Sequence, residues 1–355
     1  MPPSITATSG EWSHSNSVTI SGSGFGSKSP ATPTKWDNFE AGSVGSLVAG
    51  TTPIYGSAWG DLFIDANARP KFSDTKLRHS LSTRSARHDY VTGTNYNSSI
   101  EHLGTHAVLY MTFWWNWQRQ PSTPYARGMK PWQEFGTVSD EPGAYIGFGN
   151  PDLADGAVRN AVIDSGTSAD TTMFGNIALQ NIENEWIRHE VYLMQSSPNL
   201  FNGQFSYWIH RPNAGTPVIA LQGSDTTYRT RTSSGTWNQW TIGAYHARDD
   251  PATAAAYIYS DDVYLDVTQA RVEVGNASTW ATCTKREIQI PTAWVDGSIT
   301  VMVNRASYGA ADAAWLYVVD SSGVNSAGFA ITFGTNQGAA PPTLPVKTSR
   351  VMVIG

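Results

Sequence analysis

The chain has 355 residues and a formal net charge of −6, from 23 Lys and Arg against 29 Asp and Glu. This length is enough for two or three domains that each bury a core of their own. The negative charge and the absence of a Lys/Arg cluster argue against nucleic acid and anionic membrane surfaces as partners. No run reaches the ~20 apolar residues of a membrane span, so membrane insertion is not expected either.

The composition predicts an all-β chain. There are 32 Gly, 14 Trp and 15 Tyr but only 15% charged residues, and no amphipathic segment of helical period extends beyond about three turns. Short stretches of alternating apolar and polar residues, separated by Gly, Asn, Asp and Pro, recur instead. This pattern is typical of antiparallel β-sandwiches.

Residues 1–34 begin with the pattern of one sandwich strand and its turn. Val18 and Ile20 alternate with hydroxyl residues, which makes one face of a short strand apolar. Three glycines then surround Phe25, the composition of a tight turn with one aromatic plug. With "PSITATSG" before it, this stretch resembles the start of the IPT/TIG family of immunoglobulin-like domains. The resemblance implies several more strands, which do not follow directly in the chain.

Residues 35–283 are framed by a second pair of strand patterns. The segment opens with "WDNFEAGSVG", and its last strand reads "DDVYLDVTQARVEVG". These motifs resemble the frame of concanavalin A-like jelly rolls, the fold of lectins, glucanases and laminin G-like domains. The resemblance implies a large jelly-roll β-sandwich whose first and last strands lie side by side, which suits insertion into another domain. It specifies a fold more closely than an activity.

Three internal segments, 108–117, 186–194 and 204–211, predict a sheet with one apolar face and one mixed face, because side chains alternate with a period of two. If the three strands are neighbours, the mixed face gathers side chains that stack on sugar rings and hydrogen-bond to hydroxyls. The candidate glycan-binding residues are Tyr110, Trp114, Arg188, Glu190, Tyr192, Trp208 and His210.

A second interpretation of the same face is structural. In that case the long segments at 118–135 and 212–236 lie over it as loops and make it a secondary core. The sequence leaves both interpretations open.

The mixed face lacks the signatures of jelly-roll enzymes. A polysaccharide lyase would use an Arg to neutralise a uronate and a His or Tyr as base, roles open to Arg188, Tyr192 and His210. The "QIH" and "YFKAG" motifs of alginate-lyase-like jelly rolls are absent, however, and so is the "ExDxxE" strand of laminarinase-like ones. We therefore predict no catalytic residues. If the chain were an enzyme, a polysaccharide lyase or glycoside hydrolase would be expected.

Asp261 and Asp262 are the candidate metal ligands. Carboxylates and backbone carbonyls bind Ca²⁺ through six to eight oxygens, and many concanavalin-like domains that this chain resembles hold a structural calcium. No complete ligand loop is visible here, so either aspartate can equally cap a turn or bond a neighbouring backbone group. Structural Ca²⁺ is the only cofactor that the sequence indicates.

Residues 284–335 supply the strands that the first segment lacks. Alternation over 299–303, 316–318 and 329–333 predicts three strands. "WVDGSITVMV" and "WLYVVDSSGVNSAGFAITF" resemble a strand and the closing hairpin of the IPT/TIG family. Residues 1–34 and 284–335 thus predict one immunoglobulin-like sandwich, split by the inserted jelly roll. The alternative is two small unrelated β-modules at the ends of the chain.

Residues 336–355 predict an extended proline-rich linker that ends in an apolar strand, "RVMVIG". Such a strand needs a sheet edge. We expect 349–355 to pair with another subunit or with a capsid protein. A frayed or self-docked terminus is the alternative.

Together these features predict a non-enzymatic surface protein. The N-terminus has neither a positive region nor an apolar one, so no secretion signal is expected, and the single Cys283 excludes an internal disulfide. A chain of this kind with two domain types normally found on surfaces fits a bacteriophage virion protein, a capsid decoration or fibre-like component with a lectin-like head. The alternatives are a secreted polysaccharide lyase or glycoside hydrolase, and a bacterial cell-surface carbohydrate-binding protein.

Overall fold

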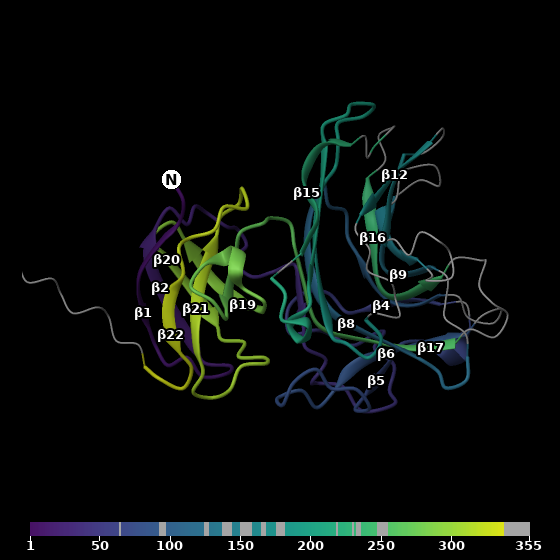
Figure 1. Cartoon of the computed structure of the whole chain (residues 1–355), viewed down its shortest axis with the longest axis horizontal. Helices are drawn as coiled ribbons and strands as arrows, with labels where there is room; N and C mark the ends of the chain where they lie inside the picture. The colour runs from purple at the N-terminus through teal and green to yellow at the C-terminus, as the bar shows by residue number, and fades with distance from the viewer. Residues whose placement is uncertain are drawn as a thin grey trace, which may run out of the picture.

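The structure is a computed structural model that describes residues 1–63, 65–91, 97–123, 128–136, 144–149, 158–164, 168–174, 182–217, 219–228, 231, 236–246 and 255–336. In these residues the chain is all-β, with antiparallel strands in three sheets and only single 3₁₀ turns of helix (Figure 1), which confirms the predicted fold class. No helix of this part of the chain is long and apolar enough to span a membrane. The predicted strand at 349–355 lies outside the described residues.

Strands from both ends of the chain form one sandwich, here called the terminal sandwich, on the left of Figure 1. Its strand order is β1-β2-β20-β19-β18-β21-β22. β19 belongs to both halves, because it pairs with β20 on one side and with β18 on the other. The strands are β1 (Ser4–Ser9), β2 (Ser17–Ser23), β18 (Arg271–Gly275), β19 (Arg286–Val295), β20 (Ser298–Met302), β21 (Ala313–Val319) and β22 (Phe329–Thr332).

The two ends of the chain share one core. β2 pairs with β20 so that Val18 lies opposite Val301 and Ile20 opposite Ile299. Phe25 is buried in the same cluster. Further members are Trp12, Val272, Val274, Val303, Leu316, Ile331 and Phe333.

One strand lies in a different sandwich from the one that the sequence suggests. The segment "ARVEVG" was expected to close the jelly roll before a boundary at 283. As β18 it pairs instead with β19 and β21 of the terminal sandwich. The prediction was wrong because the alternation of apolar residues continues from β17 into β18. The turn between them, at 267–270, contains neither Gly nor Pro that would mark a boundary.

The other strands form a second sandwich of two sheets, here called the central sandwich. The β8 sheet has the order β15-β14-β13-β8-β17-β6-β5, with β3 (Lys35–Asp37) paired to β17 (Ala255–Asp266). The first and last strands of the inserted segment therefore lie side by side, as the resemblance implies. The other strands of this sheet are β5 (Lys71–Ser73), β6 (Ser85–Val91), β8 (Val108–Arg119), β13 (Ile187–Met194), β14 (Gly203–His210) and β15 (Ile219–Tyr228).

The β16 sheet closes the other side of the central sandwich in the order β12-β11-β10-β9-β16-β7-β4. Its strands are β4 (Gly60–Phe63), β7 (Asn97–Leu103), β9 (Gly128–Gly136), β10 (Ala144–Gly149), β11 (Val158–Asp164), β12 (Ser168–Phe174) and β16 (Trp237–His246). Most of β9 and all of β15 lie in the segments 118–135 and 212–236. These segments are therefore not simply loops over the mixed face, as one interpretation had it.

The three strands with mixed faces are neighbours, which is the condition on which a shared mixed face depends. β13 pairs with β8 on one side and with β14 on the other. Phe113, Val191 and Tyr207 are among the residues of the apolar face, and they are buried in the core between the two sheets. The opposite face of these strands points towards the terminal sandwich.

An apolar cluster joins the two sandwiches. Tyr110 and Tyr192 of the β8 sheet pack in it with Ile288 and Ile290 of β19. The mixed face of the β8 sheet is therefore covered by the terminal sandwich, and its residues lie at an interface within the chain.

We expect Phe25→Ala to lower the free energy of unfolding by about 3–5 kcal/mol, because the ring is buried and its removal leaves a cavity. Urea unfolding followed by tryptophan fluorescence measures this loss. Val324→Ala, at an exposed position of the same sandwich, should change stability by less than about 0.5 kcal/mol. Equal effects of the two substitutions would contradict the packing described.

Candidate functional site

The structure brings the seven candidate glycan-binding residues onto one face and then buries most of them. Across the strand pairs, Arg188 lies opposite both Trp114 and His210, and Glu190 lies opposite Trp208. Tyr110, Arg188, Glu190 and His210 are at most 1% exposed. These four are contacts between the two sandwiches.

Glu190 is the centre of a buried ionic cluster, here called the interface network. His210 Nε2 and Arg286 Nη2 donate to its Oε2 at 2.7 and 3.1 Å. Tyr110 Oη and Arg271 Nη2 donate to its Oε1 at 3.0 and 2.7 Å. The carboxylate thus holds two donors from each sandwich.

Glu273 on β18 is the second carboxylate of the interface network. Arg188 Nη1 donates to its Oε2 at 2.8 Å, and Arg271 Nε donates to its Oε1 at 2.6 Å. Arg286 Nε lies 3.4 Å from Oε2. Three guanidinium groups from two sandwiches therefore surround two carboxylates.

The protonation states of the interface network follow from burial and charge. Burial alone would raise the pKa of Glu273, but Arg188, Arg271 and Arg286 outweigh it and bring this pKa to about 2. Glu190 likewise has a pKa well below its usual value, because Arg271 and the His210 hydrogen bond outweigh burial. Burial and the neighbouring Arg188 lower the pKa of His210 to about 3, so this ring is neutral at pH 7.

We expect Glu273→Gln to lower the free energy of unfolding by about 3–5 kcal/mol at pH 7, because it leaves buried guanidinium groups without their partner. The contribution of Glu273 is complete above the unfolded pKa near 4.5 and is lost as pH falls towards 2. The difference between the two proteins should therefore narrow below pH 4.5 in urea titrations. Glu11→Gln at an exposed position is the control, and a pH-independent difference for Glu273→Gln would contradict the ionised state.

The three aromatic candidates occupy different surroundings. Tyr192 is buried in the apolar cluster between the sandwiches, and Trp208 is half-buried at its edge. Trp114 packs with Trp186, and the guanidinium of Arg78 lies 4.5 Å from the centre of the Trp114 ring. Trp114 and Trp208 line two different pockets, which are described below.

Asp261 and Asp262, the candidate calcium ligands, are both buried. Asp262 forms an ion pair with Arg78, and Asp261 Oδ2 accepts a hydrogen bond from Ser82 Oγ at 3.2 Å. Asp261 Oδ1 also accepts from the backbone N–H of Asp262, which is the turn-bonding role that the sequence left open. Among the described residues no three His, Cys, Asp or Glu side chains are grouped to hold a metal ion, and structural calcium stays a prediction.

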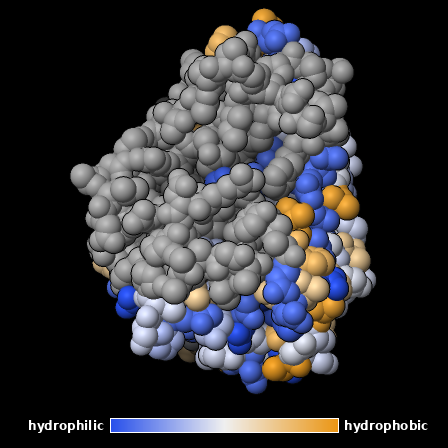
Figure 2. All heavy atoms as spheres, turned by 90° about the vertical axis from the view of Figure 1, so that its right-hand side faces the viewer, coloured by the Kyte–Doolittle hydropathy of each residue, from blue (hydrophilic) through white to orange (hydrophobic). Residues whose placement is uncertain are grey.

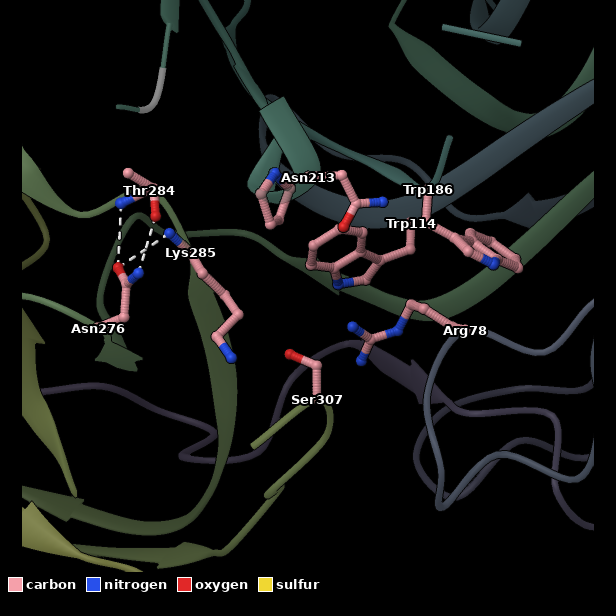
Figure 3. Close-up of a pocket in the computed structure, with 9 residues that line it drawn as sticks. Arg78, Trp114, Trp186, Asn213, Asn276, Thr284, Lys285 and Ser307 are labelled. Carbon is pink, nitrogen blue, oxygen red and sulfur yellow. Dashed lines mark hydrogen bonds between the residues drawn. The ribbon is translucent and has the colours of Figure 1, made fainter. Parts of the chain in front are cut away.

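A pocket of about 380 Å³ opens between the two sandwiches beside Trp114, and is here called the junction pocket. In Figure 3, Arg78 and Trp114 approach it from the central sandwich, and Lys285 and Ser307 approach it from the terminal sandwich. Its lining residues are Arg78, Trp114, Trp186, Pro212, Asn213, Asn276, Thr284, Lys285 and Ser307.

Three polar groups of the junction pocket are positioned by contacts with neighbouring residues. Ser307 Oγ donates to Glu287 at 2.6 Å, and Asn276 Nδ2 donates to Thr284 Oγ1 at 2.7 Å. The Lys285 ammonium lies 3.8 Å from the centre of the Tyr308 ring, and burial lowers its pKa. Amide, hydroxyl and ammonium groups held by these contacts thus line the pocket together with the indoles of Trp114 and Trp186.

Sequence reasoning missed most of this pocket. Of the candidate residues only Trp114 lines it. Arg78, Asn213 and Lys285 lie outside the alternating strand patterns, so no period pointed to them. Arg78 and Lys285 are isolated basic residues in the sequence. Their position beside Trp114 and Glu287 indicates a site only once the two sandwiches are placed together.

A second polar row lies on the β16 sheet. Thr241 lies opposite Glu101 on β7 and opposite Gln133 on β9. The neighbouring Ile242 and Trp132 belong to the core, so the row faces away from it. The row thus places an acid, a hydroxyl and an amide side by side.

Figure 2 views the molecule from the side farthest from the terminal sandwich, where described hydrophobic and hydrophilic residues are interspersed. Leu103 and Ile54 are exposed large hydrophobic residues. Scattered apolar side chains of this kind are ordinary on a protein surface.

No protein-family model and no curated protein matches the sequence. Alginate lyase Aly36B is a similar solved structure, with 14% identity and a TM-score of 0.46 over 66% of this chain and 98% of its own. The marine PL-14 alginate lyase from Aplysia kurodai has 11% identity and a TM-score of 0.47 over 66% and 99%. Peanut lectin has 7% identity and a TM-score of 0.32 over 59% and 98%. Similarity at this level says nothing about what this chain binds.

Proposed function

We propose that this chain binds carbohydrate without turning it over, and that its sugar site is the junction pocket. The observation that carries the proposal is the lining of this pocket, where the indoles of Trp114 and Trp186 lie beside amide and hydroxyl side chains. Sugars present both apolar ring faces and hydroxyls that donate and accept, and this combination of side chains matches them.

The charges around the junction pocket favour uncharged sugar hydroxyls. Arg78 is paired with Asp262 and with Glu287, the latter at 2.9 Å. The Lys285 ammonium also interacts electrostatically with the Glu287 carboxylate. Two cations and two carboxylates thus offset one another within the described residues, so the pocket has no net charge to match a charged ligand.

We expect Asn213→Ala to weaken binding of a neutral oligosaccharide about threefold to tenfold, because this exposed amide borders the pocket and one hydrogen bond is worth about 0.5–1.5 kcal/mol. Isothermal titration calorimetry, with oligosaccharides selected on a glycan array, measures the change. Asn16→Ala is the matched control, since Asn16 is exposed on the terminal sandwich away from the pocket. Failure of every glycan to bind, or equal affinities of the two variants, would contradict the proposal.

We expect no turnover of uronate or neutral polysaccharides, because the acidic groups nearest the pocket are committed to Arg78. The assay follows new reducing ends and the absorbance of unsaturated products. Turnover that survives purification and disappears in His210→Ala or Glu190→Gln would overturn this expectation.

A polysaccharide lyase or glycoside hydrolase is the second candidate function, and the polar row of the β16 sheet favours it. Glu101 also accepts a hydrogen bond from Gln239 Nε2, so an acid is held beside Thr241. Turnover lost in Glu101→Gln would assign the chemistry to this row. Display of the sugar site on a virion surface stays a prediction of the sequence.

A further inference from the structure

A second pocket, of about 220 Å³, opens on the other side of the interface network. It shares no lining residue with the junction pocket. Trp208 and Trp280 are half-buried at its walls, and Ala281 is exposed beside it. Its lining residues are Glu190, Trp208, Gln269, Arg271, Trp280, Ala281, Arg286 and Gly323.

The interface network beside this pocket has an excess of positive charge. Its three guanidinium groups face only two carboxylates, and His210 is neutral at pH 7. Lys28 and Asp266 form a separate buried ion pair at 2.6 Å. Because this pair is neutral as a whole, it does not offset the excess positive charge of the network. One positive charge is therefore left over in a region that excludes most water, where an unbalanced charge is costly.

Two buried N–H groups of the network also fall short of a hydrogen bond. Among the described residues, Arg286 Nε and Arg188 Nη2 make no hydrogen bond. Arg286 is 3% exposed and lines the second pocket, where its guanidinium carbon lies 3.7 Å from the centre of the Trp280 ring. The second pocket is thus lined by a guanidinium of the positively charged network, whose Nε has only a long contact, 3.4 Å, with Glu273 Oε2.

We propose that the second pocket is a binding site for a small anionic group, a carboxylate or a sulfate, and we call it the anion pocket. The anion neutralises the remaining charge and accepts hydrogen bonds from Arg286 and the Gln269 amide, both of which line the pocket. The group comes either from a free inorganic anion or from an acidic sugar. Binding here does not require the junction pocket to bind sugar, so either proposal can fail alone.

The test uses the full chain with sodium sulfate as the probe at constant ionic strength. Saturable quenching of tryptophan fluorescence and a saturable rise in Tm at millimolar sulfate are expected. Ala281→Glu places a carboxylate at the mouth of the pocket and should weaken sulfate binding at least tenfold. Ala281→Gln, which has nearly the same shape without the charge, should bind sulfate as the natural chain does.

Sulfate also raises Tm by general exclusion from protein surfaces, an effect that does not saturate. Val295→Glu, at an exposed position at the end of β19, controls for added negative charge and should leave the saturable response intact. A response that is linear in every protein, or equal in Ala281→Glu and Ala281→Gln, overturns the proposal. Glucose, glucuronate and glucose 6-sulfate are further probes that show whether the anionic group comes from a free inorganic anion or from an acidic sugar. Uncharged glucose that binds this pocket as tightly as the two charged sugars also overturns the proposal.

Discussion

The Glu190 carboxylate determines how the two sandwiches fit together. It is buried, and it accepts hydrogen bonds from Tyr110 and His210 of the central sandwich and from Arg271 and Arg286 of the terminal one. A buried carboxylate is tolerated only if donors from all sides replace its water. Withdrawal of the terminal sandwich would remove two of the four. The position of one sandwich on the other is therefore fixed by a polar requirement as well as by apolar packing.

The chain passes between the two sandwiches next to this interface. β17 of the central sandwich is followed after a short turn by β18 of the terminal one, and Lys28 from the first crossing pairs with Asp266 at the second. Lys28 Nζ also donates to Tyr264 Oη at 3.1 Å. Both crossings thus meet in one buried ion pair, so the inserted sandwich is held at its two ends by the same contact.

The sequence predicted the faces of the strands correctly but not what covers them. Period two separates Phe113 and Val191 from Arg188 and Glu190 whatever lies on each side. A face of Tyr, Trp, Arg, Glu and His suits a sugar as well as a network of buried ion pairs, because both need aromatic surface and fixed hydrogen bonds. The partner strands that decide the matter lie about 80 residues away, a separation at which local patterns carry no signal. β18 was assigned to the wrong sandwich for a different reason, since the turn at 267–270 has neither Gly nor Pro to mark the boundary.

The start of β19 explains why the two openings of the interface differ in charge. Successive side chains of a strand point to opposite sides. Lys285 and Glu287 accordingly reach the surroundings of the junction pocket, where Glu287 pairs with Arg78. Arg286, between them, points the other way into the interface network and the anion pocket. Three consecutive residues thus place an ion pair with Arg78 beside one opening and a guanidinium of the positively charged network beside the other, and the ligands proposed for the two pockets differ accordingly.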